Sequence, residues 1–124
     1  MHFIEAYEDK EKIVKFYFTH SDKNFTTGVM VIQPHKELTK HNRPLAVENL
    51  VQISGTCLMK LFFDEQHFEE KIMTPGTYIQ IPQGTFHIHG NPHDQESVTL
   101  FRAEGDITEI MSSVRAGFDK IDLK

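Results

Sequence analysis

His87 and His89 are two histidines separated by one residue, an arrangement suited to binding a metal ion or transferring protons. Neutral imidazole is the commonest metal ligand in proteins, and histidine also titrates near neutral pH. The two residues stand two positions apart in a run of strand-forming residues, and side chains alternate along a strand. Both imidazoles should therefore project to one face, with Phe86 and Ile88 on the other.

The residues before His87 and His89 would determine how the two side chains are oriented. Gly76 permits a turn into a strand, Pro82 ends the ladder of that strand, and Gly84 allows the reversal that starts the next one. The segment Gly76–Asn91 resembles the second motif of the cupin family at every fixed position: Gly, five residues, Pro, one residue, Gly, two residues, His, three residues, Asn. From average residue usage, chance would produce this match in roughly one chain in ten thousand.

The first cupin motif is partly present in the segment His41–Gly55. In the family, two histidines one residue apart are followed after three or four residues by a glutamate and, after six more, by a glycine. His41, Glu48 and Gly55 fit this spacing, whereas Arg43 stands where the second histidine is expected. The glycine expected before the first histidine is also missing.

The resemblance implies a divalent metal held inside a barrel by three histidines and a glutamate. It carries over His41, Glu48 and His87 as ligands and leaves one ligand unassigned. His89 is the obvious substitute. Gln52, four residues beyond Glu48 on the same strand face, is a second candidate for contact with the metal or a bound molecule. Imidazole and carboxylate ligands suit zinc, iron, nickel or manganese without choosing among them.

Arg43 leaves a second interpretation open. It could pair with Glu48 in place of a metal and leave a polar pocket for an anionic molecule, because a guanidinium matches a carboxylate with two parallel hydrogen bonds. Facing the lumen, Arg43 would be a substrate-binding residue. Beside Pro44, it could instead lie at a solvated turn.

The resemblance implies a small-molecule ligand and leaves catalysis open. As an enzyme, the chain would be a metal-dependent oxygenase, isomerase, lyase or decarboxylase, with the metal polarising a substrate oxygen or activating dioxygen. The alternative is a non-catalytic protein that binds or senses a small molecule, with or without metal. No catalytic residue is assigned, and no phosphate-binding glycine loop or nucleophile elbow is present.

The secondary structure around these residues is expected to consist of short strands. Runs of β-branched and aromatic residues, separated by Gly, Pro, Asn and Asp, indicate antiparallel strands. The predicted strands are Phe3–Ala6, Lys12–Thr19, Gly28–Gln33, Val47–Ser54, Thr56–Phe63, Glu70–Met73, Tyr78–Ile81, Phe86–His89 and Ser97–Ala103.

Only the tail of the chain is predicted to be helical. Asp106 could cap a helix that would pack on the barrel or on a second subunit. Its apolar face would consist of Ile107, Ile110, Met111, Val114 and Phe118. The expected fold is an all-β, antiparallel double-sheet jelly-roll β-barrel of the cupin type with a short C-terminal helix. It would form one domain over residues 1–124, with its motif core at 41–91.

The amino-acid composition limits the classes of partner that the protein could bind. The net charge of −5 and the dispersed 13 Lys and Arg argue against nucleic acid, and no apolar run reaches the roughly 18 residues of a membrane helix. We expect a small-molecule partner and a homodimer, the commonest closed oligomer. A cytoplasmic location is expected because the first residues do not resemble a secretion signal. The only cysteine, Cys57, is compatible with a reducing compartment.

Overall fold

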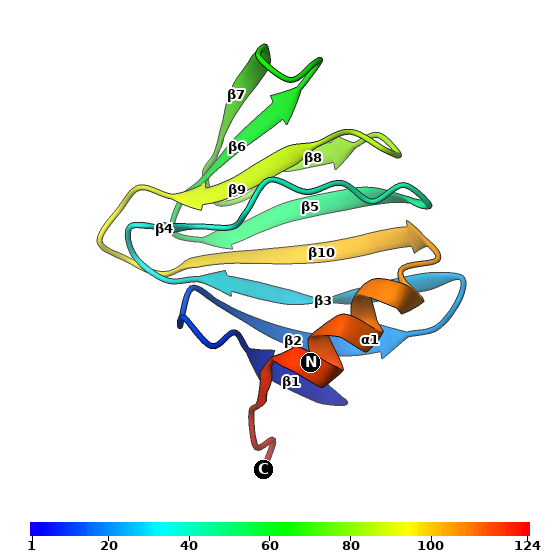
Figure 1. Cartoon of the computed structure of the whole chain (residues 1–124). Coiled ribbons are helices and arrows are strands. Elements are labelled where there is room, and N and C mark those ends of the chain that lie inside the picture. The colour runs from blue at the N-terminus through cyan, green and yellow to red at the C-terminus, as the bar shows by residue number, and fades with distance from the viewer.

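The protein consists of two antiparallel sheets and one helix, as the computed structural model describes for residues 1–124 (Figure 1). The strands of the larger sheet are β1 (Glu5–Glu8), β2 (Val14–Ser21), β3 (Phe25–Ile32), β5 (Ala46–Ser54), β8 (Tyr78–Ile81), β10 (Ser97–Gly105) and β11 (Asp119–Lys120). Those of the smaller sheet are β4 (Lys36–Glu37), β6 (Cys57–Phe62), β7 (Phe68–Met73) and β9 (His87–Asn91). The helix α1 (Thr108–Gly117) follows β10.

The order of strands differs from their order in the chain. The larger sheet runs β11-β1-β2-β3-β10-β5-β8, and the smaller runs β4-β9-β6-β7. β10 therefore lies between β3 and β5, so that Ala103 is paired with Thr26 on one side and with Glu48 on the other. The predicted all-β jelly roll with a short C-terminal helix is confirmed.

Each of the nine predicted strands has a counterpart, with ends that shift by up to three residues. The start of β3 was placed at Gly28, but this glycine lies inside the strand, where a Cβ would overlap the carbonyl oxygen of Tyr17. The two-residue strands β4 and β11 were not predicted. Both consist of exposed residues, so they carry no apolar alternation for a sequence pattern to detect.

The two sheets share a hydrophobic core. Alternate residues of the strands point inward, as in β5, where Ala46, Glu48, Leu50 and Gln52 are buried. The main cluster of buried residues is Val14, Met30, Ile32, Leu50, Cys57, Met59, Leu61, Met73, Ile79 and Ile81. No helix here has the length and apolar content that crossing a membrane requires.

The helix α1 packs on the larger sheet, as predicted for one of its two possible positions. The predicted cap at Asp106 is wrong by one residue: Ile107 is the N-cap residue and its side chain makes no capping bond. The Asp106 carboxylate instead accepts hydrogen bonds from the backbone N–H and the hydroxyl of Thr108, at 2.9 and 2.7 Å. Met111 and Val114 are buried against a second apolar cluster on the sheet, which includes Phe18 and Ala103. Figure 1 shows this helix lying across the part of the larger sheet that contains β1, β2 and β3.

One ion pair ties β1 to α1. Arg115 donates from Nε and Nη2 to the two carboxylate oxygens of Glu5, at 2.7 and 2.8 Å. The two-pronged geometry fixes both side chains. The hydrogen bond from Arg115 lowers the pKa of Glu5, although partial burial opposes it. The pair therefore stabilises the folded state only while Glu5 is ionised.

Glu5→Gln is expected to cost about 1 kcal/mol of unfolding free energy at pH 7 and almost nothing near pH 3. The folded-state pKa of Glu5 lies below its unfolded value of about 4.3, so the stabilisation is complete above that pH and is lost as the pH falls through the folded pKa. Urea unfolding at both pH values measures the difference. Asp122→Asn, in the exposed pair with Lys124, is the control and should change stability little. An equal loss at both pH values would contradict the ionic role.

Candidate metal centre

Backbone pairing brings the two motif segments together at His41 and His87. The N–H of each residue donates to the carbonyl oxygen of the other, at 3.0 and 2.8 Å, in an isolated antiparallel bridge. Leu38 N–H also donates to the His89 carbonyl oxygen at 2.9 Å. The segment before His41 thus runs alongside β9, and its position beside the second motif does not depend on side chains.

The turn of the second motif also holds the segment that carries Arg43. Gly84 N–H donates to the Arg43 carbonyl oxygen at 3.0 Å, and Gln83 Nε2 donates to the Pro44 carbonyl oxygen at 2.7 Å. Asn42 Nδ2 returns a bond to the Gly84 carbonyl oxygen at 3.3 Å. The glycine–proline spacing of the motif therefore positions residues from both halves of the site.

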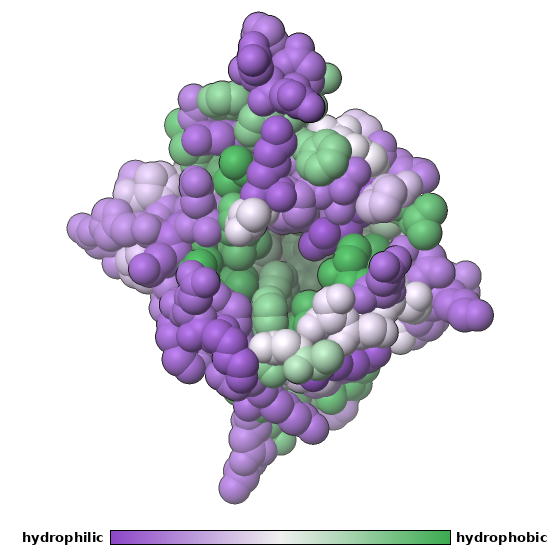
Figure 2. All heavy atoms as spheres, viewed as in Figure 1, coloured by the Kyte–Doolittle hydropathy of each residue, from purple (hydrophilic) through white to green (hydrophobic).

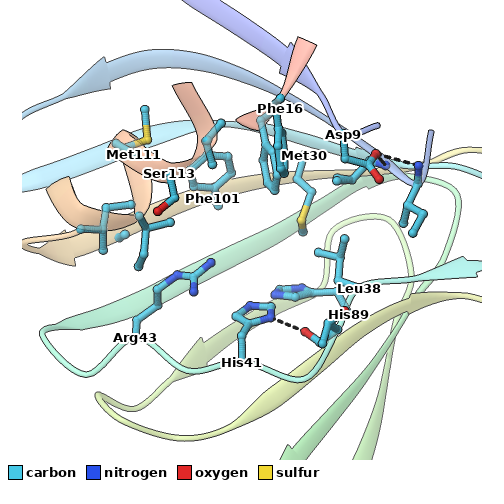
Figure 3. Close-up of a pocket in the computed structure, with 18 of the residues that line it drawn as sticks. Asp9, Phe16, Met30, Leu38, His41, Arg43, His89, Phe101, Met111 and Ser113 are labelled. Carbon is cyan, nitrogen blue, oxygen red and sulfur yellow. Dashed lines mark hydrogen bonds between the residues drawn. The ribbon is translucent and has the colours of Figure 1, made fainter. Parts of the chain in front are cut away.

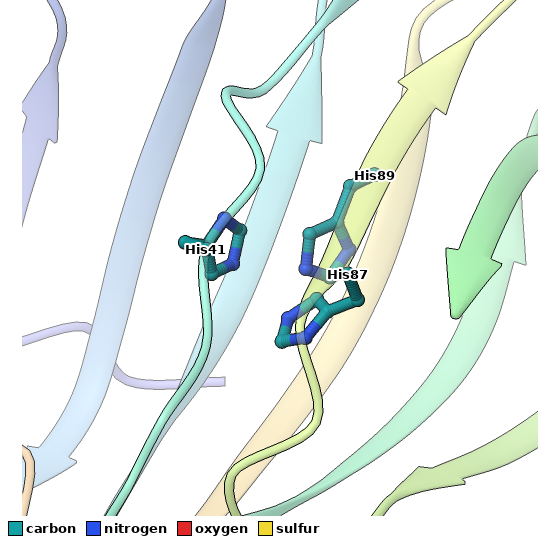
Figure 4. Close-up of side chains that lie close together, drawn as sticks. All are labelled: His41, His87 and His89. Atoms are coloured by element: carbon teal, nitrogen blue, oxygen red, sulfur yellow. The ribbon is translucent and has the colours of Figure 1, made fainter. Parts of the chain in front are cut away.

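Three imidazoles converge inside the barrel (Figure 4). The ring centroids of His41 and His87 are 4.3 Å apart, those of His87 and His89 are 4.9 Å apart, and those of His41 and His89 are 5.3 Å apart. One nitrogen from each ring lies within 4.8 Å of the others. That separation is close to the roughly 3–4 Å between two ligands of one metal ion.

Hydrogen bonds fix the proton on two of these rings. His41 Nδ1 lies 2.7 Å from the Thr39 carbonyl oxygen, and His87 Nδ1 lies 2.8 Å from the Thr85 carbonyl oxygen. Because a carbonyl oxygen only accepts, each Nδ1 must carry the proton. Nε2 of both rings is then left with a free lone pair, as in metal sites where the outer nitrogen of a ligating histidine donates to a carbonyl group.

The interior nitrogens lack partners. His87 Nε2 and His89 Nδ1 are buried and have no hydrogen-bond partner. Burial lowers the pKa of all three histidines; together with the charge of Arg43, it brings that of His41 to about 3. The rings are therefore neutral at pH 7, which is the form that binds a metal.

Glu48 lies beside the three histidines but is already engaged. Its Oε1 is 3.8 Å from His87 Nε2 and 3.3 Å from Arg43 Nε. The Glu48 side chain is only 10% exposed and that of Arg43 21%, so the pair is largely shielded from water. Arg43 faces the lumen rather than a solvated turn, and it holds the carboxylate that the first motif offers as a ligand.

Gln52 does not join the other predicted site residues. It is buried on the same face of β5 as Glu48, but its Nε2 donates to Ser97 Oγ at 3.0 Å and to the Ser54 carbonyl oxygen at 2.9 Å. Its Oε1 accepts from Thr99 Oγ1 at 2.6 Å. Its amide group is thus used to link β5 to β10, with no free donor or acceptor directed at the histidines.

A cavity of about 580 Å³ adjoins the histidines. His41, His89, Arg43 and Glu48 are among the residues that line it, whereas His87 is not. Of its 24 lining residues, 14 are hydrophobic, so most of the wall is apolar. Figure 2 shows this hollow, with hydrophobic residues inside and hydrophilic residues around its rim. The volume is in the range of small-molecule sites.

Comparison with known proteins identifies the fold. KdgF from Halomonas sp. superposes on 89% of this chain and 99% of its own, with a TM-score of 0.71 and 14% sequence identity. The cupin domain of Schizosaccharomyces pombe Cnp3 superposes on 80% of this chain and 69% of its own, with a TM-score of 0.67 and 13% identity. The chain has a cupin fold.

A third similar structure, recombinant oxalate oxidase in complex with glycolate, is a longer chain. The present chain superposes on it over 66% of its own length, with a TM-score of 0.61 and 16% identity, and spans only 42% of the oxalate oxidase chain. No family model and no curated protein matches the sequence. The likeness to solved structures is thus a likeness of fold.

The cupin barrel leaves the other histidines outside the site. His20, His35 and His67 lie at the surface, where each contacts an aspartate: Asp22, Asp94 and Asp64. The helix contributes lining residues that sequence reasoning did not assign to the site, namely Ile110, Met111, Ser113, Val114 and Gly117. Their helical spacing predicts packing on the barrel, but it does not show that part of the packed face borders a cavity.

Proposed function

We propose that this cupin binds a divalent transition metal through His41, His87 and His89, with Glu48 beside them, and a small organic molecule in the adjoining cavity. The metal would be zinc, iron, nickel or manganese, all of which accept imidazole ligands. When bound, it would supply a Lewis acid or an oxygen-binding centre, which fits oxygenase, isomerase, lyase or decarboxylase chemistry. Arg43 would hold an anionic group of the molecule.

The two unpartnered ring nitrogens carry this proposal. A buried polar atom without a partner costs about 1–3 kcal/mol, so two of them side by side need an explanation. A water molecule could satisfy one, but a nitrogen from each of the three rings lies within 4.8 Å of the other two. A metal ion would satisfy all three at once, and the neutral rings are already in the ligating form.

Metal content tests the proposal directly. Protein purified without added metal, or incubated with zinc, nickel or manganese and then desalted, is expected to carry about one metal ion per chain by elemental analysis. His41→Ala and His87→Ala should each lose nearly all of it, because two imidazoles and a carboxylate already paired with Arg43 form a poor site.

The matched control is His67→Ala, which removes an exposed histidine paired with Asp64 and should leave the metal content unchanged. Glu48→Gln separates the role of the carboxylate. If Glu48 turns toward the metal, this variant should weaken binding at least tenfold. Wild-type protein that carries no metal and takes none up would contradict the proposed metal site.

One observation supports a metal-free alternative. Glu48 is paired with Arg43, so the site already contains a balanced pair of charges without a metal. In that case the protein would be a non-catalytic cupin that binds or senses an anionic molecule at Arg43. A metal-free protein in which an organic anion still binds, and Arg43→Gln abolishes that binding, would favour this alternative.

The proposal includes two further expectations. A homodimer is supported by the edge strand β7, where Ile72 is 66% and Phe68 41% exposed, because pairing of two copies would cover this edge.

A cytoplasmic location is supported by Cys57, which is a free, buried thiol. Burial raises the pKa of Cys57 to about 11, so the thiol is unreactive at neutral pH.

A further inference from the structure

The cavity has two chemically different sides (Figure 3). His41 and the guanidinium of Arg43 lie on one side. Facing them are Phe16 and Phe101 from the larger sheet and Met111 from the helix α1. A ligand that fills this space must therefore present a polar group to one side and an apolar surface to the other.

Arg43 can accept an anion without giving up its present contacts. Its Nε faces Glu48 at 3.3 Å, and its Nη1 donates to the Asn42 carbonyl oxygen at 3.2 Å. Nη2 makes no hydrogen bond within the protein. The other cation on the cavity wall, Lys10, is 68% exposed and pairs with Asp119. Arg43 is therefore the cation that an anionic group inside the cavity would meet.

The apolar side is too large to serve a two-carbon acid. The cavity measures about 580 Å³, and its apolar wall runs from the core residue Met30 to Ile110 and Met111 of the helix. A small polar acid at Arg43 would leave this wall in contact with water. An apolar body would displace that water and bind by the hydrophobic effect.

We infer that the molecule bound here is an organic monocarboxylate with an apolar body of about six to ten carbon atoms. Its carboxylate faces Arg43, and its body lies along the wall formed by Phe16, Phe101 and α1. This inference rests on the proposed function for the place of the site. Arg43 and the apolar wall, however, are present whether or not a metal binds.

Calorimetric titration with butanoate, hexanoate and octanoate tests the inference. Affinity is expected to rise about fourfold for each added methylene, the gain that burial of one methylene gives. Octan-1-ol, which has the body without the charge, should bind more weakly than octanoate. Arg43→Gln should weaken octanoate binding at least tenfold and leave octan-1-ol unchanged, while Arg43→Lys should keep part of the affinity.

Two neighbouring serines provide matched variants of the apolar wall. Ser112 and Ser113 are both exposed on α1, and each hydroxyl donates to the carbonyl oxygen four residues earlier. Only Ser113 borders the cavity. Ser113→Phe should fill the apolar side and remove the dependence of affinity on chain length, whereas Ser112→Phe should keep it.

Each titration is run on metal-loaded and on chelator-treated protein. Chain-length dependence in protein that binds no metal would support the inference while the metal proposal fails. Equal affinity for the three acids, or tighter binding of glycolate than of octanoate, would overturn the inference even where the metal content is stoichiometric.

Discussion

Saturation with metal is expected to raise the free energy of unfolding by about 4 kcal/mol when free metal is a thousand times its dissociation constant. The gain arises because only the folded chain brings His41 next to His87 and His89. For a chain of this length it corresponds to a rise of roughly 10–15 °C in Tm. Calorimetry of chelator-treated protein, with and without zinc or nickel, measures this rise.

The ligand variants decide whether the rise belongs to this site. In His87→Ala the metal should no longer change Tm. His20→Ala, which alters a surface histidine paired with Asp22, should keep the full rise. A rise that persists in His87→Ala would place the metal elsewhere on the molecule and contradict the proposed centre.

Gly55→Ala is expected to lower the free energy of unfolding by about 3–5 kcal/mol. Gly55 has a φ of +66°, and a Cβ there would overlap the carbonyl oxygen of Glu96. It would also lie 3.2 Å from the Ser97 Cα. Backbone atoms of the segment leading into β10 cannot move aside without disturbing the pairing of that strand. Urea unfolding measures the loss.

Gly76→Ala separates the close approach from the backbone conformation. Gly76 has a φ of +91°, but a Cβ there would meet no atom within 4 Å. This variant should cost only about 1–2 kcal/mol, the strain of placing a side chain at positive φ. Equal losses in the two variants would mean that the contact with Glu96 has no role.

Much of the fold could be predicted because its strands are half-buried. In β5 and β6, inward and outward residues alternate, and this period is legible in the sequence. β7 shows why ends are harder to place: five of its six residues are exposed, and it was predicted two residues too short. The order of strands in the sheets was not predicted, since no pattern within a strand specifies its neighbour.

Part of the candidate site could likewise be predicted from the sequence, and part could not. His87 and His89 could be placed together by strand alternation, and His41 by its motif. Gln52 was placed with Glu48 by the same alternation, but its cross-strand neighbours Ser97 and Thr99 engage its amide. The pairing of Arg43 with Glu48 was one of the interpretations left open. The apolar cavity could not be foreseen, because apolar residues that line it, such as Met30 and Leu50, cannot be told from core residues by sequence pattern.

The position of β10 between β3 and β5 has a consequence for biosynthesis. While the nascent chain is emerging from the ribosome, the edges of β3 and β5 that pair with β10 stay unpaired until residues 97–105 are released. Those exposed edges are prone to join other chains. The protein should therefore complete its fold only after most of it has been translated.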